Sequence, residues 1–239
     1  DDALAAGPNV LYYVSNRDGT FAEAQELTSD GVGYGMTLAR DVDGDNDLDV
    51  IASSSEKGIV VIKNNGDGTF SEEDLITSFG GITRISTADM DGDGDLDIVS
   101  GSYSGKRLAW HENQGDGTFA PEVVFNDDVD GMYSVATADL NNDGTPEIVT
   151  AEFGDDNSVA LYFKTDEGFE RTTISNDLDS PLAVTIADID GDGDEDVVAA
   201  AYSGNEIVWY ENDGAAGFTT NENSLITTGV GGPFRVRAA

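Results

Sequence analysis

The sequence predicts an all-β fold, a β-propeller of four-stranded blades, and three observations support this prediction. Turn-ending phenylalanines recur at spacings of 49, 49, 50 and 49, at Phe21, Phe70, Phe119, Phe169 and Phe218. Acidic loops begin at spacings of 48, 50 and 49, at Asp41, Asp89, Asp139 and Asp188. Each unit contains four short runs of strand-forming residues, and no segment keeps a helical period. Four strands in a repeat of about 40–50 residues are typical of a propeller blade.

The second unit illustrates the elements in order. An alternating strand (82–88) precedes an acidic loop (89–97), and a short apolar strand (98–103) follows the loop. A third strand (108–113) ends before the turn Gly115-Asp-Gly-Thr-Phe119, and a fourth strand is expected around residues 123–125. The turns are rich in Gly and Asp, as turns between antiparallel strands usually are.

The two ends of the chain resemble complementary parts of one blade. Residues 231–239 match a first strand, whereas residues 2–6 and 10–14 match a second and a third. We therefore expect one domain, 1–239, that forms a closed ring of five blades, because pairing the ends would cover exposed strand edges. The alternative is a piece cut from a longer array. The blades are expected at 1–30 plus 229–239, and at about 31–79, 80–129, 130–179 and 180–228.

Composition narrows the partners and the location. The chain has 48 acidic and 11 basic residues, a net charge of −37, so nucleic acid is a poor candidate partner. No apolar run approaches the length of a membrane span, so we expect no membrane insertion. Cysteine is absent, but calcium can replace disulfides in a secreted protein. No signal peptide precedes Asp1, so any leader has been removed or left out, and we expect a secreted or cell-surface protein.

The acidic loops predict about four calcium sites. Side-chain oxygens recur at loop positions 1, 3, 5 and 9, and position 7 is expected to offer its backbone carbonyl. The candidate ligands are Asp41, Asp43, Asp45, Asp47, Asp49, Asp89, Asp91, Asp93, Asp95, Asp97, Asp139, Asn141, Asp143, Thr145, Glu147, Asp188, Asp190, Asp192, Asp194 and Asp196. An EF-hand needs Glu at position 12, where this chain has Ala52, Ser100, Thr150 and Ala199. The alternative is a set of solvated turns, which four loops in register make improbable. The third loop is the weakest, because Asn141 replaces a carboxylate.

These motifs resemble the FG-GAP/VCBS repeat of integrin α-subunit propellers and of many secreted bacterial and algal proteins. The resemblance rests on Asp-x-Asp-Gly-Asp-Gly-Asp-x-Asp-Ile-Val, then Trp-x-x-Asn or Trp-Tyr-Glu-Asn, then Gly-Asp-Gly-Thr-Phe, and it covers nearly the whole chain. It implies calcium between strands 1 and 2 of each blade, and a ligand face on the opposite side. Propellers of this family often have seven or eight blades, which is more than the five expected here.

On that opposite face we expect Tyr34, Arg84, Tyr103, Tyr133, Phe153 and Tyr202, together with Pro181 and Phe234. Aromatic platforms beside polar residues suit sugar rings. The favoured function is a binding or adhesion module for a glycan or an extracellular protein, which could be part of a larger chain. A polysaccharide-processing enzyme and a purely structural repeat domain are the alternatives. Catalysis is not expected, because the only histidine is His111 and no nucleophile elbow occurs.

Overall fold

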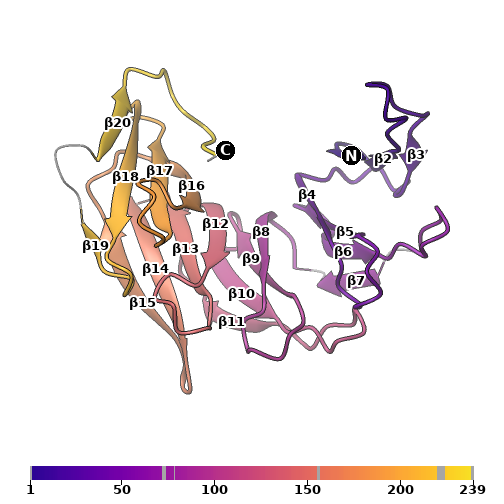
Figure 1. Ribbon diagram of the computed structural model, residues 1–239, viewed down its shortest axis with the longest axis horizontal. Helices are drawn as coiled ribbons and strands as arrows, with labels where there is room; N and C mark the ends of the chain where they lie inside the picture. Colours follow the sequence, from indigo (N-terminus) through magenta and orange to yellow (C-terminus); the bar gives the residue numbers. More distant parts are fainter. Residues whose placement is uncertain (1, 72–73, 78, 155–156, 220–223, 238–239) are drawn as a thin grey trace.

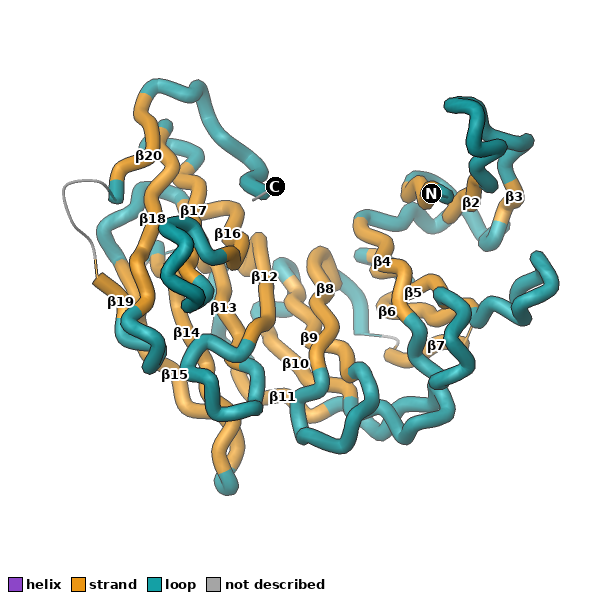
Figure 2. The backbone as a smooth tube through the Cα atoms, viewed as in Figure 1, coloured by secondary structure: helices purple, strands orange, loops and turns teal. Residues whose placement is uncertain are grey.

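The computed structural model describes residues 2–71, 74–77, 79–154, 157–219 and 224–237. Within these residues the chain forms strands, turns and loops but no helix, as Figure 2 shows. The all-β prediction is confirmed. Among the same residues, no helix is long and apolar enough to cross a membrane.

Five antiparallel sheets follow one another along the chain. The first sheet contains β1 (Ala3–Ala6), β2 (Val10–Tyr13) and β3 (Gln25–Glu26). The second contains β4 (Met36–Arg40), β5 (Asp49–Ser54), β6 (Gly58–Ile62) and β7 (Asp74–Thr77). The third contains β8 (Ile82–Ala88), β9 (Asp97–Ser102), β10 (Arg107–His111) and β11 (Val123–Asn126).

The last two sheets repeat the pattern. The fourth contains β12 (Met132–Ala138), β13 (Glu147–Glu152), β14 (Ser158–Thr165) and β15 (Gly168–Ser175). The fifth contains β16 (Pro181–Ala187), β17 (Asp196–Ala201), β18 (Glu206–Asn212), β19 (Phe218–Thr219) and β20 (Leu225–Thr228), the last two both pairing with β18. Each of these sheets lies within one 49-residue unit.

The sheets are arranged as an arc, with the first strand of each unit toward the middle (Figure 1). The inner strands contact one another in chain order, and polar side chains join them. Ser86 Oγ on β8 lies 2.8 Å from Thr137 Oγ1 on β12, and Ser134 Oγ on β12 accepts the Val184 N–H of β16 at 3.2 Å. The inner strands therefore hold neighbouring sheets in register.

The second strand of each unit is buried along its whole length, in β5, β9, β13 and β17. β5, β9 and β13 each contribute to a core cluster on both faces of their sheet, whereas β17 contributes to the cluster that it shares with the fourth sheet. The core is divided between adjacent sheets. One part joins the third and fourth sheets around Met132, Ile148 and Tyr162, and another joins the fourth and fifth around Val149, Leu161 and Val197.

The expected closure of the ring is not formed in this structure. In the described part of the chain β1 pairs only with β2, and residues 229–237 lie in no strand. Gly231 and Gly232 turn the backbone with φ of 68° and 69°, and Pro233 has no N–H to donate to a ladder. The prediction of a strand from residue 231 is therefore wrong for the described residues 231–237. The closed ring of five blades remains a prediction.

Candidate metal centre

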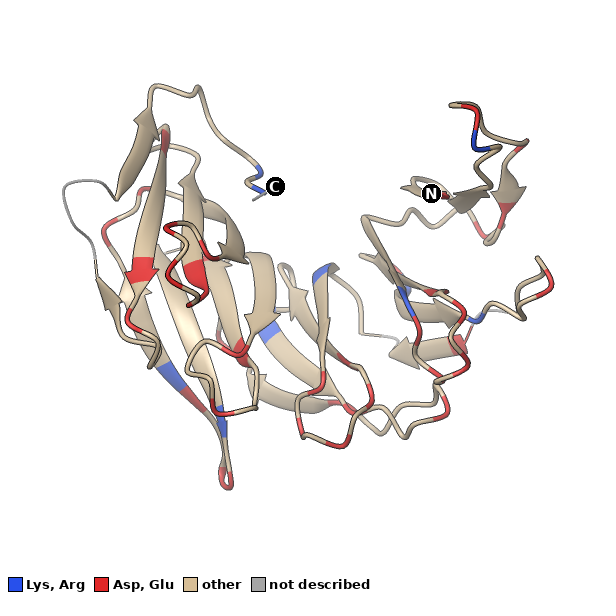
Figure 3. Cartoon of the chain, in the orientation of Figure 1, with Lys and Arg blue, Asp and Glu red and all other residues tan. Residues whose placement is uncertain are grey.

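Each acidic loop connects the first and second strands of its unit, so the loops lie at one edge of neighbouring sheets. Figure 3 shows Asp and Glu concentrated in these connections. The backbone curls tightly within each loop. In the second loop, Gly92 adopts a φ of 79° and donates its N–H to Asp89 Oδ1 at 2.7 Å, while Gly94 donates to Asp89 Oδ2 at 3.0 Å. Position 1 thus organises the curl that brings the later carboxylates back toward it.

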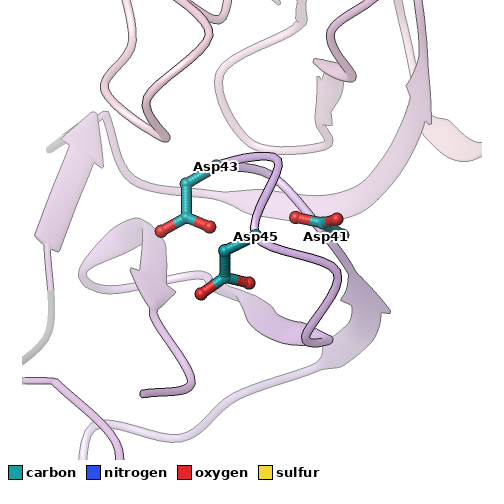
Figure 4. Close-up of side chains that lie close together, drawn as sticks. All are labelled: Asp41, Asp43 and Asp45. Carbon is teal, nitrogen blue, oxygen red and sulfur yellow. The ribbon is translucent and has the colours of Figure 1, made fainter. Parts of the chain in front are cut away.

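Three loops bring three carboxylates together, with one oxygen of each within 4.8 Å of the others. The trios are Asp41, Asp43 and Asp45 in the first loop, Asp89, Asp91 and Asp93 in the second, and Asp188, Asp190 and Asp196 in the fourth. Figure 4 shows the first trio, in which the carboxylates of Asp43 and Asp45 lie side by side and that of Asp41 lies across the loop. These groups could hold a metal ion.

The first trio contains a buried carboxylate oxygen without a hydrogen-bond donor among the described residues. Asp43 Oδ1 is buried, and no hydrogen bond reaches it in the described part of the chain. A buried carboxylate oxygen without a partner is costly, because it has lost its hydration. An oxygen donor of this kind among two further carboxylates fits a hard cation.

Position 9 has a different environment from the other ligand positions. Asp97 is fully buried, its Oδ2 accepts the Met90 N–H at 3.0 Å, and its Oδ1 accepts the Asn113 N–H at 2.8 Å. Asp49 and Asp196 accept the equivalent pairs of backbone donors. Burial raises the pKa of Asp49 and of Asp97, and nearby carboxylates add to the effect. Position 9 therefore anchors the loop to the third strand, and in the fourth loop it also joins the trio.

The side chains at position 7 point away from the trios. The carboxylates of Asp47, Asp95 and Asp194 lie against the Gly66, Gly115 and Gly214 backbones, respectively. Gly115 adopts a φ of 82°, which favours glycine in the turn between the third and fourth strands, and a Cβ there would come within 2.6 Å of Asp95 Oδ2. The side chains at position 7 thus pack on this turn rather than on the trio.

The third loop differs, as its sequence suggests. Asn141 Nδ2 donates to Glu147 Oε1 at 3.1 Å, and Asn141 Oδ1 accepts the Asp143 N–H at 2.8 Å. Asp139 again accepts backbone donors, and Thr145 donates its N–H to Asp143. Burial, together with the charges of Asp143 and Asp139, raises the pKa of Glu147 to about 7. This loop lacks a trio of carboxylates because an amide stands at position 3.

Side-chain hydrogen bonds that join successive units were not predicted from the sequence. Asn113 Nδ2 donates to the Val42 carbonyl of the preceding acidic loop at 2.8 Å, and Asn212 Nδ2 donates to Leu140 O at 2.7 Å. In the fourth sheet Lys164 takes this place, and its Nζ reaches Met90 O at 3.0 Å. The recurring Asn that precedes the turn between the third and fourth strands could have indicated these hydrogen bonds. The first three loops are thus each tied to the next unit as well as to their own.

The residues expected on the opposite face come together in part. Tyr133 lies 5.0 Å from Tyr103, 6.1 Å from Phe153 and 6.3 Å from Phe234, measured between ring centroids. Burial raises the pKa of Tyr133, and the positive charge of Arg84 acts against that rise. We call Tyr103, Tyr133, Phe153 and Phe234 the aromatic cluster. Tyr202 is exposed and lies against Gly232 instead.

The prediction that Tyr34 lies on the ligand face is wrong. Its side chain is buried among Val10, Val50 and Val60, and its hydroxyl donates to Asp30 Oδ2 at 3.0 Å. The residues before β4 fold over the core between the first two sheets, so the Tyr34 ring fills that core rather than a binding surface. His111 is also buried, with Nε2 2.9 Å from Ser100 Oγ, which fits a structural role.

Comparison with solved structures places the fold among known ones. Proteins of Bacteroides uniformis and Bacteroides fragilis, provisionally assigned as 6-phosphogluconolactonases, align with TM-scores of 0.69 and 0.66 at 13% and 14% identity. The alignments cover 98% and 95% of this chain, and 69% and 67% of theirs. These β-propeller-like neighbours support the fold class. At such identity they show the fold alone, so they decide nothing about catalysis.

An Agrocybe aegerita lectin, described as recognising non-reducing terminal N-acetylglucosamine, aligns over 96% of this chain and 81% of its own at 19% identity. Its TM-score of 0.47 is too low to bear on fold or ligand. No curated protein sequence matches the chain. The family model of the FG-GAP-like repeat matches three times, at residues 41–100, 89–150 and 188–239, and each match begins at the first aspartate of an acidic loop. Because these matches cover more than half of its length, the chain belongs to the FG-GAP-like repeat family.

Proposed function

We propose that this protein is a calcium-stabilised extracellular binding and adhesion module. The observation that carries the calcium part is the convergence of three carboxylates within 4.8 Å in each of three loops. Calcium prefers six to eight oxygen ligands, and carboxylates with backbone carbonyls provide them in such a loop. Magnesium is a poorer fit, because it demands a more regular shell and retains its waters.

The partner is proposed to bind on the face opposite the acidic loops. The turns after β9 and β13 lie there, and they present Tyr103 and Phe153 with 42% and 37% of their surface exposed. A cavity of about 380 Å³ lies between them, lined also by Lys106 and Asp130. Aromatic rings beside charged and hydroxyl groups suit a sugar ring, whose C–H face stacks while its hydroxyls form hydrogen bonds. A glycan is therefore the favoured partner, and an extracellular protein is the second.

A glycan array probed in calcium and in EDTA tests this function. We expect binding in calcium that is lost in EDTA, because the acidic loops order the units that carry the aromatic cluster. Phe153→Ala should abolish the signal, whereas Phe21→Ala should retain it. Phe21 is a control on another surface, because it is also exposed but ends a turn between the third and fourth strands of its unit. If neither glycans nor extracellular proteins bind, only a structural role remains.

The proposal also includes the five-bladed ring. It is supported by the central cavity, which β1 and the C-terminal residues line together through Leu4, Ala6 and residues 234–237. The two segments that closure would pair thus already face one space. If they pair in solution, the amides of residues 234–237 should exchange with deuterium far more slowly than an unstructured chain. Exchange at the unstructured rate would contradict closure.

A further inference from the structure

The central cavity, of about 560 Å³, has an unusual lining for so acidic a chain. The inner strands β4, β8, β12 and β16 line it together with β1 and the C-terminal residues. Its charged lining residues are Arg84, Arg235 and Arg237, and no Asp or Glu lines it in the described part of the chain. The chain has only 11 basic residues against 48 acidic ones, so three arginines at one cavity stand out. Figure 3 shows Lys and Arg at the C-terminal end, which points toward the middle of the arc.

Five of the eight basic side chains elsewhere in the chain form ion pairs with carboxylates. The pairs are Lys57 with Asp30, Lys63 with Asp43, Lys106 with Asp130, Arg107 with Glu122 and Arg171 with Glu152. Arg84 donates only to the Thr83 carbonyl, at 2.6 Å, and within the described ranges neither Arg84 nor Arg235 forms an ion pair. Arg84 and Arg235 therefore lack the carboxylate partner that most basic side chains outside the cavity have.

The two arginines also repel each other. Burial lowers the pKa of Arg84, and the positive charge of Arg235 lowers it further. Like charges facing one cavity raise the free energy of the fold unless an anion lies between them. The planar guanidinium can donate two parallel hydrogen bonds to a carboxylate or a sulfate, which makes arginine well suited to bind such a group.

The aromatic cluster lies beside this positive cavity. Phe234 immediately precedes Arg235, and its ring contacts Tyr133 at 6.3 Å. Arg84 acts electrostatically on the same Tyr133. A ring platform next to a pair of guanidinium groups matches a sugar that carries an acidic substituent.

The geometry points to the central cavity as a subsite for the acidic group of a glycan. Arg84 and Arg235 bind its carboxylate or sulfate, and Tyr133 with its aromatic neighbours contacts the sugar ring. This inference rests on the proposed glycan-binding function and adds the chemical class of the glycan. An acidic peptide offers the same charge without a sugar ring, so it would leave the exposed rings unused.

Calorimetry in calcium buffer tests the subsite with four probes: a galacturonate trisaccharide, the neutral galactose trisaccharide, sodium sulfate and a short acidic peptide. We expect the acidic trisaccharide to bind the native chain, and Arg84→Gln to weaken that binding by about tenfold or more, as expected for loss of a charged bidentate contact. Arg17→Gln is the control, because it makes the same change of net charge on an exposed turn. Without ligand, Arg84→Gln should keep or raise the melting temperature, since it removes the repulsion from Arg235.

Each other outcome overturns the inference in a distinct way. Equal binding of both trisaccharides, unaffected by Arg84→Gln, would overturn the acidic subsite and leave glycan binding intact. Sulfate binding that needs Arg84, with neither trisaccharide bound, would assign the cavity to a free oxyanion and overturn the glycan part. A lower melting temperature in Arg84→Gln with unchanged binding would make Arg84 a structural residue. Binding of an acidic peptide in place of any sugar would overturn glycan recognition altogether.

Discussion

Chelation of calcium by EDTA is expected to lower the melting temperature by about 20 °C, more than any single substitution considered for this chain. A cation that binds only the folded state at 100 times its Kd contributes about 2.7 kcal/mol per site, and three sites therefore contribute about 8 kcal/mol. That is comparable to the whole stability of an ordinary domain, about 5–15 kcal/mol. For a chain of this size, each kcal/mol corresponds to about 2–4 °C.

The physical reason lies in the loops themselves. They hold five, five, three and six acidic residues in chain order, out of 48 in the chain. Two charges 4.8 Å apart repel by about 3 kcal/mol at an effective dielectric constant of 20, and each trio contains three such pairs. Without a cation this repulsion opposes the curl of the loop and the packing of neighbouring sheets. Circular dichroism during heating, with and without EDTA, measures the difference.

Variants of the second loop distinguish stabilisation by a bound ion from stabilisation by general screening of charge. Asp91→Asn removes a member of the trio, so it should lower the melting temperature in calcium and raise it in EDTA. Asp95→Asn makes the same change of charge in the same loop, but its carboxylate lies against Gly115 and outside the trio. It should therefore leave the difference in melting temperature between calcium and EDTA nearly unchanged. If sodium chloride at matched ionic strength stabilises the chain as much as calcium does, specific binding is contradicted.

Repetition made most of the fold predictable from the sequence. The period of the phenylalanine turns and acidic loops fixes where each unit begins, and alternation of side chains fixes its strands. The sheets from β4 to β20 therefore follow from local patterns. The ends of the chain do not, because pairing across a ring depends on contacts between residues far apart in sequence. Gly231, Gly232 and Pro233 were a local signal against a strand, and the alignment with other units outweighed it.

The candidate sites were predictable to different degrees for a similar reason. The trios come from single loops, so spacing alone located them. The ligand face depends on which side chains meet between units, and there Tyr34 turned inward while Phe234 joined Tyr133 from the other end of the chain. Arg235 was missed because nothing in its own segment marks it. Its significance comes from Arg84, some 150 residues earlier, and from the absence of carboxylates around the cavity that the described residues line.

Asp97→Ala is expected to cause the largest loss of stability of any single substitution, and to do so with calcium present or absent. The buried carboxylate accepts two backbone N–H groups, from Met90 and Asn113. Removing it leaves both buried donors without a partner, at about 1–3 kcal/mol each. Because burial raises the pKa of Asp97, the loss of its charge offsets part of this cost, and we expect a net loss of about 3 kcal/mol.

The effect extends beyond the loop, and this distinguishes an anchor from a metal ligand. The Asn113 side chain that Asp97 positions also holds Val42 O of the preceding unit, so loss of the anchor should loosen the contact between the second and third sheets. Chemical unfolding of Asp97→Ala and of Asp91→Ala, each in calcium and in EDTA, measures the difference. Removal of a trio carboxylate such as Asp91 should lower stability only while the ion is bound, whereas removal of Asp97 should lower it in both buffers. A loss confined to calcium buffer would make position 9 a ligand first and an anchor second, and would shift the main stabilisation of the loop from its backbone hydrogen bonds to the ion.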